Sequence, residues 1–133
     1  MEVFGSRWKN HWQRIAADWK SRVSDDDVVL IAGDTSWAMH LKDAQEDLDQ
    51  IRALPGRKIM IRGNHDYWWE SAGKLNRMDA ENKIQYLYGS TAVLGDKEIA
   101  ICGTHGWVCP GDIHYQEARD AKPYRRELLL SRR

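Results

Sequence analysis

Residues 58–66 constrain this chain more than any other part of its sequence. A short apolar run of the kind that forms a buried strand stops at Gly63, and Asn64, His65 and Asp66 follow at once. In open α/β sheets, ligands bind beyond the carboxyl ends of strands, and glycine allows the sharp turn needed there. Asn and Asp alone would be ordinary turn formers. The histidine between them favours a functional loop.

A second strand end lies upstream and is expected beside the first. Residues 28–31 are apolar without alternation, which predicts a strand buried on both faces, and the run leads to Asp34. Apolar residues recur at helical spacing over 41–54 before Pro55. Strand, helix and strand in this order form a βαβ unit with a right-handed crossover. We therefore expect Asp34 to lie next to Asn64, His65 and Asp66.

The remaining segments predict further elements of an α/β domain. Tryptophans recurring from Trp8 predict an amphipathic helix with a buried face and Ser6 as its N-cap. We also predict a helix over 71–78, a strand over 84–88, a hairpin of 91–94 and 98–102 turning at 95–97, and a final helix over 124–130 after an interruption at Pro123. Cys102 is interpreted as a core residue, and His40 as a residue at a helix start.

Composition narrows the class of protein. The 133 residues include 20 Lys plus Arg and 20 Asp plus Glu, so the net charge is zero. A neutral chain disfavours nucleic acid as a partner without eliminating it, and it remains compatible with a small phosphorylated substrate. There is no signal-peptide pattern and no apolar run of the ~20 residues that span a membrane, so we expect a soluble cytoplasmic protein.

The polar residues at the two strand ends suit metal-assisted attack on a phosphoester. Two divalent ions about 3.5–4 Å apart can clamp the attacking and leaving oxygens of such a reaction. A carboxylate can touch both ions, as Asp34 would, and Asn64 adds a neutral ligand. His65 would protonate the leaving group, and Asp66 would hold its imidazole in the required tautomer.

The motifs GD at 33–34 and GNHD at 63–66 resemble signature motifs of the calcineurin-like metallophosphoesterases, and GTHGW at 103–107 looks like a bacterial branch of predicted phosphohydrolases. The resemblance implies an α/β sandwich with βαβ units, a mixed sheet and a β-hairpin. It also implies that Asp34 bridges two metal ions, that Asn64 ligates one and that His65 assists the leaving group. The ions would be manganese, iron, zinc or a mixed pair, and the substrate a phosphoester.

The family's first motif, D-x-H, and its later motifs, a lone His and then G-H-x-H, are missing at the expected places in this sequence. No D-x-H precedes Gly33 and no G-H-x-H follows it. His105 is interpreted as a structural loop histidine, with a role in the site as the alternative. We therefore expect one domain over residues 1–133, truncated at both ends, with impaired hydrolysis and an exposed sheet edge open to self-association.

Two other functions stay open from sequence alone. The chain could be a non-catalytic binding or scaffold module of the same fold. A nucleotide-binding domain of another class is less favoured, because the sequence lacks a GxGxxG or GxxxxGK[ST] phosphate loop.

Overall fold

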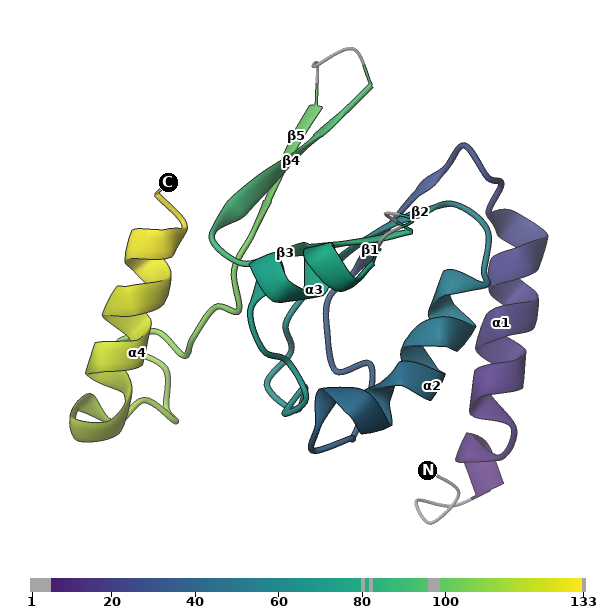
Figure 1. Ribbon diagram of the computed structural model, residues 1–133. Helices are drawn as coiled ribbons and strands as arrows, with labels where there is room; N and C mark the ends of the chain where they lie inside the picture. The colour runs from purple at the N-terminus through teal and green to yellow at the C-terminus, as the bar shows by residue number, and fades with distance from the viewer. Residues whose placement is uncertain (1–5, 80, 82, 96–98, 133) are drawn as a thin grey trace.

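The computed structural model describes residues 6–79, 81, 83–95 and 99–132 (Figure 1). In chain order the elements are the 3-10 turn η2 (Ser6–Trp8), α1 (His11–Arg22), β1 (Val28–Ile31), α2 (Leu41–Arg52), β2 (Arg57–Ile61), α3 (Ala72–Met78), β3 (Ile84–Leu87), β4 (Ser90–Leu94), β5 (Ile99–Gly103) and α4 (Glu117–Leu130). In the part of the chain so described, no helix has the length and apolar content needed to cross a membrane.

The strands form two sheets. Strands β1, β2 and β3 lie in that order and run parallel, with Val28 opposite Arg57 and Lys58 opposite Ile84. Strands β4 and β5 pair antiparallel as a hairpin. The predicted βαβ unit is confirmed as β1-α2-β2, and the expected combination of parallel and antiparallel strands is confirmed but divided between two sheets. The predicted hairpin turn lies partly outside the described residues.

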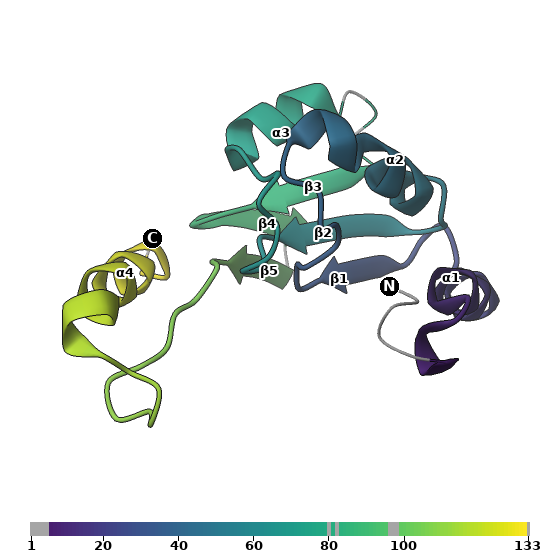
Figure 2. The same cartoon turned by 90° about the horizontal axis from the view of Figure 1, so that it is seen from below.

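Helices α2 and α3 cover one face of the parallel sheet (Figure 2). Their apolar residues pack with those of the strands and of the segment before α3 in one core. Its buried members are Leu41, Ala44, Leu48, Ile51, Met60, Trp68, Trp69, Leu75, Ile84 and Tyr86. A smaller cluster on the other side joins Ile59 and Leu87 to Ala92 of the hairpin. The sheet is therefore fully covered on one face only.

Strand β1 is not buried on both faces, and this prediction was wrong. It is an edge strand of the described three-stranded sheet. Leu30 is 61% exposed although its register partner Ile59 is 2% exposed, because the hairpin residues pack over β2 and β3. An apolar run shows that a strand suits burial, but it does not show which neighbours cover it.

Helix α1 also buries less than its pattern predicted. None of its residues is fully buried, Ile15 is 49% exposed, and Trp12 packs only partly against the core. Its N-cap is Asn10 rather than Ser6, which lies in the preceding 3-10 turn. The indole of Trp19 nevertheless donates a hydrogen bond of 3.0 Å to the carbonyl of Pro55. The helix is therefore held beside the α2–β2 connection, as Figure 1 shows.

The C-terminal part of the chain differs from two further predictions. Helix α4 begins at Glu117 and continues through Pro123. The proline lacks one backbone N–H, but the loss of that single hydrogen bond does not end the helix. It stands apart from the sheet in both views (Figures 1 and 2). Cys102 is exposed instead of filling the core, and its sulfur lies 3.2 Å from the hydroxyl of Thr91 on the neighbouring strand.

Candidate metal and phosphoester site

The loops that follow β1 and β2 touch through their backbones. A Cβ added to Gly33 would lie 2.1 Å from the nitrogen of Gly63, and one added to Gly63 would lie 2.1 Å from Oδ1 of Asp34. No side chain fits at either position, since real Cβ atoms essentially never approach other atoms that closely. The two glycines thus allow the loops to approach until Asp34 lies against the loop that carries Asn64 and His65.

Asp34 presents its carboxylate at the point where the loops meet. Its backbone is left-handed, with φ of 55°, a conformation that Asp adopts more readily than most residues. Oδ1 accepts a hydrogen bond of 2.9 Å from the backbone N–H of His65, and Oδ2 lies 3.3 Å from Nδ1 of the same residue. That backbone hydrogen bond is the main cause that lowers the pKa of Asp34. Because the side chain is 46% exposed, its anionic oxygens remain accessible.

Asp66 is fully buried and ties the two loops together. Its Oδ2 accepts hydrogen bonds of 2.8 Å from the backbone N–H groups of Asp34 and Gly63. Its Oδ1 accepts from the backbone of Thr35 at 2.9 Å and from the indole of Trp68 at 3.0 Å. A buried carboxylate with this many donors is a structural anchor.

His65 therefore does not depend on Asp66 for its orientation, which differs from the sequence-based expectation. Both oxygens of Asp66 are engaged by other donors, and the carboxylate near the imidazole belongs to Asp34. The indole of Trp37 stacks on the imidazole, with ring centroids 5.2 Å apart and planes at 19°. Tyr67 meets it edge-on at 6.2 Å. The imidazole, 41% exposed, thus lies between Asp34 and two aromatic side chains.

Asp34 and Asn64 open into a cavity of about 490 Å³. Arg62 and His105 line the same cavity, together with residues 106–108, Arg119 and Asp120. His105 also contributes to lowering the pKa of Asp34 through its charge. This position favours the alternative interpretation of His105, a role in the site. The sequence signal for it was a histidine two positions after a glycine at a strand end, an arrangement that His65 shares.

One part of the cavity lining is an ion pair between the exposed Arg119 and the buried Asp120. The guanidinium of Arg119 donates two hydrogen bonds of 2.8 Å to the two oxygens of Asp120. This contact holds the pKa of Asp120 well below its usual range. Trp107 adds a hydrogen bond of 3.1 Å from its indole to Asp120, so the loop after β5 is fastened to α4. Sequence reasoning did not predict any of these contacts, because they join segments without a shared motif.

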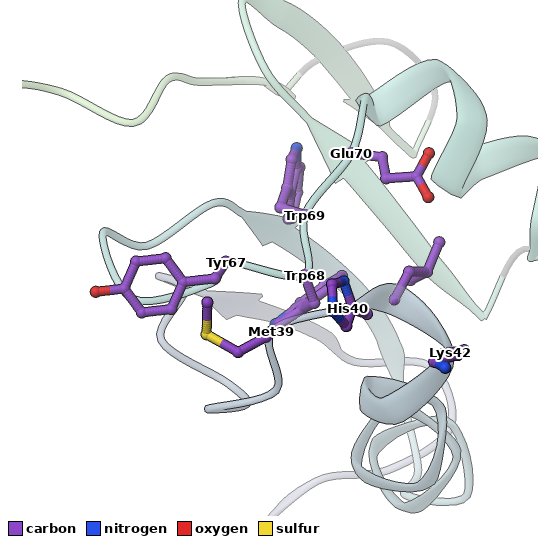
Figure 3. Close-up of a pocket in the computed structure, with 8 residues that line it drawn as sticks. Met39, His40, Lys42, Tyr67, Trp68, Trp69 and Glu70 are labelled. Atoms are coloured by element: carbon purple, nitrogen blue, oxygen red, sulfur yellow. The ribbon is translucent and has the colours of Figure 1, made fainter.

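A second cavity, of about 480 Å³, is lined in part by the residues that directly follow the GNHD motif (Figure 3). It is formed by the start of α2 and residues 67–70. The side chains of Met39 and Tyr67, which line it, are exposed, and His40, the N-cap residue of α2, lines it as well. The position predicted for His40 at a helix start is confirmed.

The residues present supply part of a divalent-metal site. A carboxylate from Asp34 and an amide oxygen from Asn64 are ligands of the type that suits such ions. Within the described ranges, however, no group of three or more His, Cys, Asp or Glu side chains could hold an ion. The donor set therefore fits one side of a metal site, and the described residues do not close it.

The parallel three-stranded sheet, with helices on one face and metal-competent loops at its carboxyl edge, defines an α/β domain. The family model for calcineurin-like phosphoesterases matches residues 6–132, and the chain belongs to this family. Membership confirms the resemblance read from the GD and GNHD motifs and implies metal-dependent phosphoester hydrolysis in general. No curated protein and no solved structure matches the chain.

Proposed function

We propose that this chain provides part of the active site of a metal-dependent phosphoester hydrolase, with Asp34 and Asn64 as metal ligands and His65 as the acid for the leaving group. The observation that supports this most is the junction of the two loops, which brings the Asp34 carboxylate against the backbone and imidazole of His65. A bound divalent ion would polarise the phosphoryl group and lower the pKa of the attacking water.

Each side chain has a separate task in this proposal. Asp34 would be the ligand that bridges the ions, which would be manganese, iron or zinc, because its carboxylate is anionic and exposed. Asn64 adds an oxygen ligand without cancelling the metal charge. His65, beside Asp34 and open to solvent, donates a proton to the departing oxygen. Asp66 acts as a positioning residue, because it holds the backbone on which the other three depend.

We further propose that this polypeptide by itself binds metal weakly and hydrolyses slowly. Two ligands are fewer than a metal pair needs, and affinity depends on ligand count and geometry. No D-x-H precedes Gly33, where the family has its first motif, and the sequence contains no G-H-x-H. The same observation supports the alternative function, a non-catalytic binding module that keeps the strand-end loops.

Hydrolysis of p-nitrophenyl phosphate and of its bis ester, with and without added manganese, separates the two functions. Asp26→Asn is the matched control for Asp34→Asn, because Asp26 lies in an exposed turn. The proposal expects manganese-dependent hydrolysis that Asp34→Asn abolishes and Asp26→Asn preserves. Absence of hydrolysis in the wild type at saturating manganese favours the binding module, and activity that survives Asp34→Asn contradicts the assigned ligand.

A further inference from the structure

Arg62 carries a charge for which the described residues provide no partner. It lies between the last residue of β2 and Gly63, and its Nε is buried without a hydrogen-bond acceptor. Among the described residues, no carboxylate lies within salt-bridge distance of its guanidinium. A charged group without an acceptor is costly, and because Arg62 also lines a cavity, the missing acceptor points to a ligand bound in that cavity by the guanidinium.

The position of Arg62 indicates where such an acceptor would lie. Arg62 lines the cavity into which Asp34 and Asn64 open. The other arginine of this cavity, Arg119, is engaged at two points by Asp120. Arg62 is thus the arginine of this wall whose hydrogen-bonding capacity is left for a ligand.

We propose that Arg62 binds a non-bridging phosphoryl oxygen of the substrate and forms the anion subsite beside Asp34 and Asn64. The guanidinium is permanently charged and presents its donors in a planar fork that matches phosphate oxygens. The identification of the anion as substrate rests on the proposed hydrolase function. Binding of inorganic phosphate at Arg62 does not require turnover and tests the subsite directly.

One structural role competes with this proposal. Glu127 of α4 has a buried Oε2 without a partner, and its Oε1 accepts a hydrogen bond of 2.7 Å from the hydroxyl of Tyr88. The charges of Arg62 and Glu127 both act on the pKa of Tyr88, so the two groups lie in one neighbourhood. If Arg62 served only to balance Glu127, its replacement would loosen α4 and leave phosphate binding to other groups.

The charge of Asp34 sets how phosphate binding depends on metal. This carboxylate lines the same cavity and repels an anion, whereas His105 attracts one when it is protonated. A divalent cation at Asp34 would remove the repulsion. Manganese is therefore expected to tighten phosphate binding, and the contribution of Arg62 is to be measured with and without it.

Isothermal titration of the full chain with inorganic phosphate tests the subsite. Wild type is compared with Arg62→Lys, Arg62→Gln and Glu127→Gln, and circular dichroism verifies that each variant is folded. Arg62→Lys keeps the charge but loses the fork, and we expect it to weaken binding about tenfold, or about 1.4 kcal/mol. Arg62→Gln is expected to weaken it further, and Glu127→Gln to leave the affinity unchanged.

Three results would overturn the inference. These are no phosphate binding by the wild type in the presence of manganese, equal affinities of wild type and Arg62→Lys, or an equal loss in Glu127→Gln. The results that contradict the proposed hydrolase function differ from those that contradict the Arg62 subsite. Phosphate binding that depends on Arg62, in a chain that hydrolyses nothing, removes the hydrolase function alone, whereas hydrolysis with a phosphate affinity indifferent to Arg62 removes this inference alone.

Discussion

The backbone N–H of Asp34 donates a hydrogen bond of 2.8 Å to the carboxylate of Asp66, which joins the ends of β1 and β2. The same oxygen accepts from the N–H of Gly63, so one buried carboxylate fixes both loops. The last residue of the GNHD motif thus acts on the site through the backbone. Its contribution is to hold the backbone of Asp34 and His65 in place. Replacing Asp66 should therefore lower the free energy of unfolding even where it does not change a reacting group.

Asp66→Asn should destabilise the fold. The amide N–H₂ group that replaces one oxygen would face backbone donors that are buried, and hydrogen bonds to a charged acceptor would be lost. We expect a loss of about 3 kcal/mol in the free energy of unfolding, measured by urea titration. Asp26→Asn, in the exposed turn before β1, should change it by less than about 0.5 kcal/mol. Equal unfolding free energies for the two variants would show that Asp66 does not tie the loops.

Asp34 should make a small pH-dependent contribution to stability. The backbone N–H of His65 lowers its pKa in the folded state below the ordinary 3.8. A lowered pKa means that the contribution is present above the unfolded-state pKa and is lost as the pH falls through the folded-state pKa. The difference in unfolding free energy between wild type and Asp34→Asn should therefore shrink as the pH is lowered from 5 toward 2. A difference that grows over this interval would contradict the hydrogen bond as the cause.

His65→Ala should slow hydrolysis most for poor leaving groups. An alkoxide needs a proton as it departs, whereas p-nitrophenolate leaves readily without one. If His65 is the acid, kcat/KM for an alkyl phosphate should fall about 10²–10⁴-fold, and less for p-nitrophenyl phosphate. His114→Ala is the control, because His114 is an exposed histidine on the segment before α4. Equal losses for the two substrates would argue against proton donation to the leaving group.

The open edge of β1 should promote self-association. Leu30 is 61% exposed on an edge strand, and exposed apolar edges pair with other chains. Sedimentation of the wild type should show a concentration-dependent increase in mass, and Leu30→Lys should reduce it. Leu129→Lys is the control, because Leu129 is 64% exposed but lies on α4. A wild type that remains monomeric at high concentration would contradict this prediction.

Local sequence predicted the elements whose signals are local. The helical period before Pro55 gave the bounds of α2 to within two residues, and Ser71 caps α3 by accepting the N–H of Lys74. The βαβ order then sufficed to place Asp34 beside the GNHD loop, since parallel strands end at one edge of a sheet. Apolar periodicity was less reliable for burial. It predicted that Leu30 and Ile15 are buried, but both are exposed, because burial depends on which other residues pack against a side chain.

The sequence by itself determined the family, the parallel strands and the residue types at their ends, because these follow from short motifs and from periodicity. Only the tertiary structure decided what each residue contacts. It assigned Asp66 to the backbone of a loop about 30 residues away, placed His105 in the cavity of Asp34, and left the Nε of Arg62 buried without a partner. Such contacts depend on how distant segments pack, and no local pattern in the chain records that packing.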